Sequence, residues 1–190
     1  MRVSKILYHG TTVLRWSFIK RNGLLSSNMS KSFEADEYLG LNTGYVYLTT
    51  NVDEAIWYGL NKSLLDMAYL DIPKTMTLNP NYRDPVVLGI NAFKLGDNME
   101  IDPQLNTSLA QITDEQFQNF QNKNTQWYRY KGDIKLKHLS AYKYVPFDTF
   151  SSNLINEMMK INEEKLHMSQ LISANAKSPK MMAMSMGGFK

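Results

Sequence analysis

Short apolar runs separated by polar breaks dominate the first half of the chain. The apolar run at 5–8 predicts a strand, and the aromatic and β-branched run at 44–50 predicts another. Between them, apolar positions at helical spacing over 13–21, closed by an Asn-Gly pair, predict a short helix with a glycine stop. The polar stretch 26–42 shows no period and predicts a loop.

A long helix and a buried strand are expected next. Asn51 with Glu54 three residues later has the pattern of a capping box, which predicts a helix over 52–69. The mostly apolar run 86–93 predicts the clearest buried strand of the chain. The Gly-Asp-Asn sequence at 96–98 predicts a turn after it.

The following residues alternate short strands with turns. A second capping-box pattern at 113–116 predicts a helical turn. A strand is expected over 127–130, a turn over 131–133, and a strand-rich stretch over 134–145. This mixture of short strands and few helices predicts an α+β fold.

The character of the chain changes after Pro146. Apolar residues at loose helical spacing predict a C-terminal helix, through Leu154, Ile155, Met158, Met159, Ile161, Leu166, Leu171 and Ile172. The methionine-rich segment 176–190 has no period and predicts a flexible tail or a partner-binding strip. We therefore divide the chain into a first domain over 1–148 and a C-terminal helix and tail over 149–190.

Composition narrows the functional classes only a little. The 190 residues, 43% of them hydrophobic, suit one packed domain with an appendage, and a net charge of +3 neither argues for nucleic-acid binding nor excludes it. The absence of cysteine excludes disulfides and thiolate nucleophiles, and no histidines stand at metal-ligand spacing, so no metal is expected. No run approaches the ~18 apolar residues of a membrane span. A cytoplasmic protein without a membrane partner is the expectation.

Three motifs carry the chemistry. The first is YHGTT at 8–12, at the end of a predicted strand. The second is GYVYLTTN at 44–51, followed by AIWY at 55–58. The third is TQWYRY at 125–130. In this order the motifs resemble the ADP-ribosyltransferase superfamily, specifically the histidine–tyrosine–glutamate branch that contains the poly(ADP-ribose) polymerases.

The resemblance covers roughly residues 5–147 and implies a fold and a ligand. The implied fold has two packed mixed β-sheets that form an NAD cleft, with flanking helices. The implied ligand is NAD, as a substrate. The residues that would contact it are His9, Gly10, Thr11, Tyr47, Thr49 and Tyr58.

Each implied role has a physical reason. Tyr47 and Tyr58 would sandwich the nicotinamide, a planar cation that aromatic faces attract by about 1 kcal/mol each. His9 would hydrogen-bond the neighbouring ribose, and the Gly10 backbone would hold the carboxamide. Taken alone, a histidine is more often structural and a strand tyrosine is ordinary. The matching order of three motifs favours the functional interpretation.

Gln126 departs from the family pattern. The resemblance places a glutamate there, as the catalytic group that steadies an oxocarbenium-like centre beside His9 and Tyr47. Glutamine keeps the size and an accepting oxygen but loses the charge. Three explanations stay open: a natural variant with altered chemistry, a degenerate binder, or an engineered inactive form.

The resemblance implies mono-ADP-ribosyl transfer to a macromolecule, protein or nucleic acid, as a toxin, phage or defence effector. The acceptor would face the segment 112–125, through Phe117 and Phe120. An antitoxin or chaperone would dock on 150–190, unless that stretch packs on the domain itself. The alternatives are an RNA 2′-phosphotransferase, disfavoured because the second motif has Tyr47 and no histidine, and a module that binds NAD or a partner without catalysis.

Overall fold

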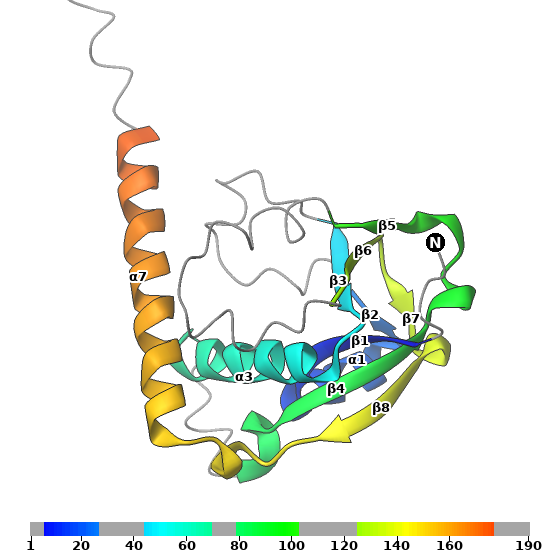
Figure 1. Ribbon diagram of the computed structural model, residues 1–190, viewed down its shortest axis with the longest axis horizontal. Helices are drawn as coiled ribbons and strands as arrows, with labels where there is room; N and C mark the ends of the chain where they lie inside the picture. Colours follow the sequence, from blue (N-terminus) through cyan, green and yellow to red (C-terminus); the bar gives the residue numbers. More distant parts are fainter. Residues whose placement is uncertain (1–5, 27–43, 70–78, 103–124, 177–190) are drawn as a thin grey trace, which may run out of the picture.

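The computed structural model describes residues 6–26, 44–69, 79–102 and 125–176. In these ranges the protein has an α+β fold, as expected (Figure 1). The described residues form three α-helices, one six-stranded sheet and one two-stranded sheet.

The large sheet is antiparallel throughout. Its strands are β1 Ile6–Thr12, β3 Tyr45–Thr49, β4 Pro85–Asn91, β5 Met99–Ile101, β6 Trp127–Lys131 and β8 Leu139–Tyr144. They lie in the order β5-β6-β3-β1-β4-β8. The small sheet pairs β2, Leu24–Leu25, with β7, Ile134–Lys135, also antiparallel.

The expectation of mixed sheets is wrong for a topological reason. Helix α3, Val52–Tyr69, connects β3 to β4, and these two strands run parallel to each other because each is antiparallel to β1. Strand β1 lies between them. Every hydrogen-bonded neighbour is therefore antiparallel, although β3, α3 and β4 form a crossover connection.

The predicted starts of the helices over 13–21 and 52–69 are confirmed, and the second helix forms only part of its predicted capping box. Helix α1, Val13–Asn22, is capped by the Thr12 hydroxyl, which accepts from Arg15 N at 3.2 Å, and it ends at Gly23 in the left-handed conformation (φ 74°). Helix α3 has the predicted bounds. Only half of its capping box forms, because Asn51 Oδ1 accepts from Asp53 N while Asn51 N donates to Thr49 Oγ1.

Other boundaries move by a few residues. The first strand runs on to Thr12 because β4 pairs with its whole length. The predicted strand 86–93 ends at Asn91, whose side chain caps the 3₁₀ turn η3, Ala92–Lys94. The stretch 134–145 is interrupted by η5, Leu136–His138. The remaining 3₁₀ turns are η2 Pro80–Arg83, η4 Gly96–Asn98 and η6 Phe147–Thr149. The helical turn expected at 113–116 lies outside the described residues.

Two layers cover the large sheet. On one face, side chains of α1 and of the small sheet pack with the buried residues of β1, β3 and β4. The members of this core are Leu7, Trp16, Ile19, Leu25, Val46, Leu48, Val86, Leu88, Ile90, Ala92, Leu95, Tyr128 and Ile134. Helix α3 covers the other face, along β1 and β4 (Figure 1).

Two glycines allow α3 to lie directly on β1. A Cβ added to Gly10 would meet the carbonyl oxygen of Ala55 at 1.8 Å, and one added to Gly59 would meet the carbonyl oxygen of Thr11 at 2.8 Å. The obstacles are backbone atoms, which no side-chain rotation can remove. The helix axis can therefore approach β1 only where both side chains are missing.

The C-terminal helix packs its first half on the domain. Helix α7, Ser152–Ala176, places Met158 against Leu60 and Leu64 of α3, and Asn162 Nδ2 donates to Asn61 Oδ1 at 2.8 Å. The packing alternative thus holds for this half of the helix, whereas 177–190 lie outside the described residues. No helix within the described ranges has the length and apolarity to cross a membrane.

The glycine contact predicts a sharp difference between two strand positions. Gly10→Ala should lower the free energy of unfolding by about 3 kcal/mol or more, because the new methyl group overlaps backbone. Gly89→Ala, on the neighbouring strand, meets nothing closer than 3.5 Å and should change stability by less than about 1 kcal/mol. Urea denaturation of both variants measures this. Equal stabilities would contradict the packing described for α3.

Candidate functional site

Strands β1 and β3 touch at one point and then separate. Their backbones pair at Tyr8 with Thr49, whereas β1 pairs with β4 from Ile6 to Thr12. Beside this pair His9 spans the gap, and its Nδ1 donates to the backbone carbonyl oxygen of Tyr47 at 2.9 Å. The structure thus brings together the histidine of the first motif and the tyrosine of the second.

This hydrogen bond fixes the state of the His9 ring. A carbonyl oxygen only accepts, so Nδ1 carries the proton and Nε2 presents a lone pair. Burial lowers the pKa of His9 to about 4, with further lowering from the charges of Lys62 and Arg15 and partial opposition from the Tyr47 carbonyl. Near neutral pH the ring is uncharged and offers one acceptor.

Gln126 shares a face of the sheet with His9. The register aligns His9 with Leu48, and Leu48 with Tyr128 of β6. Gln126 precedes Tyr128 by two residues and so points to the same face. Tyr47 lies on the opposite face, with Gly10 beside it across the separation of β1 and β3.

Three hydrogen bonds hold Gln126 against the end of β3. Its backbone N donates to Thr50 Oγ1 at 3.0 Å, and its backbone carbonyl accepts from Thr50 N at 3.0 Å. The hydroxyl of the buried Tyr128 donates to Gln126 Oε1 at 2.7 Å. Both polar ends of the residue are therefore anchored by the sheet.

Tyr58 stands on the other face, on the side of α3 that meets β6. Its ring makes edge contacts with Trp127 and with Trp57, at centroid distances of 5.3 and 5.2 Å. Burial raises the pKa of the Tyr58 phenol, and the nearby Glu54, Asp102 and Tyr47 raise it further. These electrostatic neighbours show that Tyr47 and Tyr58 lie close together on this face.

Sequence reasoning missed two buried acids beside Tyr58. Glu54, one helical turn before Tyr58, is 8% exposed, and Asp102 is fully buried with its backbone N bonded to Trp127 O at 3.0 Å. Burial and, to a smaller extent, Asp53 raise the pKa of Glu54 to about 7. The capping-box pattern assigns Glu54 to the helix cap; the signal for its burial is its spacing of four residues from Tyr58, which places both on one helical face.

The other expected ligand residues have structural partners of their own. Gly10 makes room for Ala55, and the carbonyl oxygen of Thr11 faces Gly59. The hydroxyl of Thr49 accepts from Asn51 N at 3.1 Å. Their expected contacts with a ligand stay predictions. Phe117 and Phe120 lie outside the described residues.

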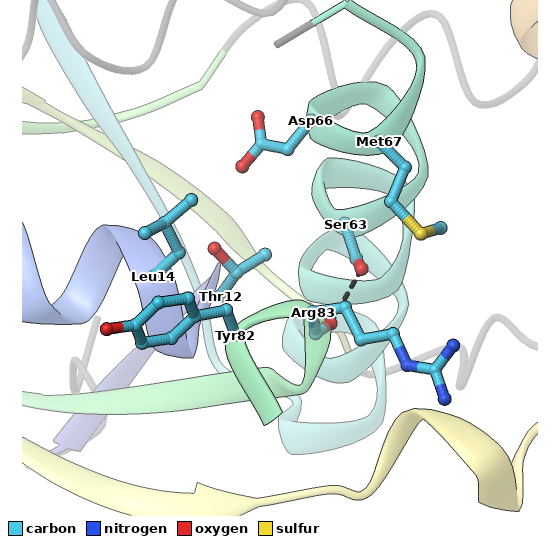
Figure 2. Close-up of a pocket in the computed structure, with 7 residues that line it drawn as sticks. All are labelled: Thr12, Leu14, Ser63, Asp66, Met67, Tyr82 and Arg83. Atoms are coloured by element: carbon cyan, nitrogen blue, oxygen red, sulfur yellow. Dashed lines mark hydrogen bonds between the residues drawn. The ribbon is translucent and has the colours of Figure 1, made fainter. Parts of the chain in front are cut away.

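A small pocket lies apart from the His9–Tyr47 pair, between α1, α3 and η2 (Figure 2). It is lined by Thr12, Leu14, Ser63, Asp66, Met67, Tyr82 and Arg83. Its polar groups are engaged by the protein, since the Ser63 hydroxyl donates to the Arg83 carbonyl at 2.6 Å and Arg15 forms a two-point ion pair with Asp66. The pocket is therefore a small gap between packed elements, and we assign it no ligand.

Comparisons with protein-family models, with curated proteins and with solved structures find no match to this chain.

The buried acid predicts an unusual dependence of stability on pH. Because the pKa of Glu54 rises from 4.5 to about 7 on folding, its contribution is fully present below about pH 4.5 and is lost as the pH rises towards 7. Glu54→Gln should therefore stabilise the protein by about 1–3 kcal/mol above pH 7 and by little below pH 4.5. Thermal unfolding of both forms across this range measures it; Asp53→Asn, on the exposed side of the same turn, is the control. A constant difference would exclude the buried, protonated state.

Proposed function

We propose that the chain binds NAD at the separation of β1 and β3 and transfers ADP-ribose from it to a macromolecule. The observation that carries the proposal is the hydrogen bond from His9 Nδ1 to the Tyr47 carbonyl. It joins two motif residues 38 positions apart, in the order in which the resemblance requires them. Tyr58 lies on α3, and Gln126 immediately precedes β6, the strand that pairs with β3.

The residues fit the chemistry of NAD. The free Nε2 of the neutral His9 can accept a hydrogen bond from a ribose hydroxyl. Tyr47 and Tyr58 are neighbours on the α3 face, where their rings can contact a planar aromatic cation. The carboxyl of Glu54 is buried on this face, and its ionised form would add negative potential that also favours a cation.

The reaction needs little from the protein besides positioning and charge. The bond between ribose C1′ and the nicotinamide nitrogen breaks, its electron pair leaves with nicotinamide, and an acceptor atom bonds to C1′ and loses a proton. Positive charge grows on the ribose meanwhile, and a carboxylate nearby would stabilise it. Gln126 occupies the position for that group and is neutral.

This neutrality favours a second candidate, an NAD-binding module without turnover. Gln126 is already anchored through Tyr128 and Thr50, so it can hold a ribose hydroxyl through its amide while supplying no charge. The two candidates share the binding site and differ only in turnover. Measuring transfer by the Gln126→Glu variant distinguishes the transferase from the binding module.

Gln126→Glu should raise the rate of ADP-ribosyl transfer by about two orders of magnitude or more. The exchange is nearly isosteric, and the Tyr128 hydroxyl can donate to the carboxylate as it does to the amide, so NAD affinity should change little. Single-turnover transfer from labelled NAD to total protein and to total RNA measures the rate.

Two controls sharpen this test. Gln126→Leu keeps the bulk without polar atoms and should stay inactive. Adding His9→Ala to Gln126→Glu should abolish the gain if the charge acts on a ribose that His9 holds. Equal rates for the glutamine and glutamate forms would mean that Gln126 does not face the reacting centre.

A further inference from the structure

Three exposed lysines surround His138 at the end of the large sheet where β1 begins. Lys94 ends η3, Lys135 belongs to β7, and Lys137 lies in η5. In Figure 1 the segment after β4 and the connection from β7 to β8 meet on this side of the molecule. Burial lowers the pKa of His138, and the charges of Lys137, Lys94 and Lys135 lower it further. The three residues Lys94, Lys135 and Lys137 form what we call the lysine patch.

No salt bridge from the described residues balances the charges of the lysine patch. Within the described residues, none of its three members takes part in an ion pair. Asp97, in η4, and Asp133, before β7, lie on adjoining segments, where two acids stand beside three lysines. The patch therefore presents a positive field to solvent, as sites for polyanions do.

An exposed aromatic ring accompanies these charges. Phe93, the residue before Lys94, is 73% exposed, the most exposed large apolar side chain among the described residues. Tyr142 and Tyr144 of the edge strand β8 are also exposed, but they lie further along the strand, where Tyr144 pairs with Val86 and the Tyr142 ring contacts Tyr8 at 4.9 Å. Elsewhere cations are already engaged with rings, as Lys20 is with Trp16 at 5.6 Å. The lysine patch thus combines exposed cations with the exposed ring of Phe93.

We propose that the lysine patch and Phe93 form a binding surface for single-stranded nucleic acid. Lysines would contact successive phosphates, and the exposed ring would stack on an unpaired base. An acidic peptide could use the cations but has no planar base for Phe93. The ring therefore favours a single strand over other polyanions.

The position of this surface connects it to the proposed function. The patch and Gln126 lie at the same end of the large sheet, since Leu139 pairs with Ile90 there and Thr50 is bonded to Gln126. Strands β3, β1 and β4 lie between β6 and β8. A bound strand of several nucleotides that crossed this end of the sheet could approach Gln126. Only the further step, that such a strand is the ADP-ribose acceptor, rests on the proposed function.

Binding can be measured without NAD. A fluorescent single-stranded RNA of about ten nucleotides should bind the full chain at low salt, by anisotropy. Changing Lys94, Lys135 and Lys137 together to glutamine should weaken binding about tenfold or more and remove about two units from the slope of log affinity against log salt. Phe93→Ala should weaken binding about tenfold with the slope unchanged. Far-ultraviolet circular dichroism checks that each variant folds.

A matched variant removes the same charge elsewhere. Lys20, Arg21 and Lys160 on α1 and α7, changed together to glutamine, should leave RNA affinity within about twofold. Equal weakening by the two triple variants, no binding by any form, or tighter binding of a duplex or an acidic peptide than of the single strand would each overturn the proposal. Since NAD is absent, these outcomes are independent of whether Gln126→Glu gains transferase activity.

Discussion

Helix α3 lies on β1 at a distance set by backbone atoms, with Ala55 over Gly10 and Gly59 over Thr11. The direction of α3 also carries the chain from β3 past β1 to β4, so the same contact fixes the order of the central strands. It places Tyr58 and Glu54 above β3 and β6, because they lie on the turns that flank Ala55. The aromatic and acidic side of the candidate site therefore depends on glycine at positions 10 and 59.

The two faces of the sheet contribute different chemical groups to the proposed NAD site. His9 and Gln126 share one face and offer neutral hydrogen-bonding groups there, His9 at the separation of β1 and β3 and Gln126 beside Thr50 at the end of β3. Tyr58 lies on the other face with the buried acids Glu54 and Asp102, and burial raises the pKa of Glu54 there. A ligand in the separation would meet neutral hydrogen-bonding groups on one side, and aromatic rings with buried carboxyl groups on the other. Such an arrangement suits a ribose joined to an aromatic cation.

Local signals predicted the elements well, and long-range contacts decided the rest. Helix α3 has its predicted bounds because period, cap and composition agree over eighteen residues. The pairing of β1 along its full length extended the first strand, and Asn91 ended β4 earlier than its apolar run suggested. The convergence of His9 and Tyr47 followed from motif order. The burial of Glu54 and Asp102, the anchoring of Gln126 by Tyr128, and the lysines around His138 depend on which strands become neighbours, which no local pattern encodes.

The account is tested most directly by NAD binding to variants that differ by one ring on one strand. Tyr47→Ala removes the ring beside Tyr58, and Tyr45→Ala removes a ring two residues earlier on the same face, where Arg129 covers it at 4.6 Å. By calorimetry the unchanged chain should bind NAD, Tyr47→Ala and His9→Ala should each lose at least about 1 kcal/mol of binding free energy, and Tyr45→Ala should lose little. Absence of NAD binding, or equal affinity of Tyr47→Ala and the unchanged chain, would contradict the account.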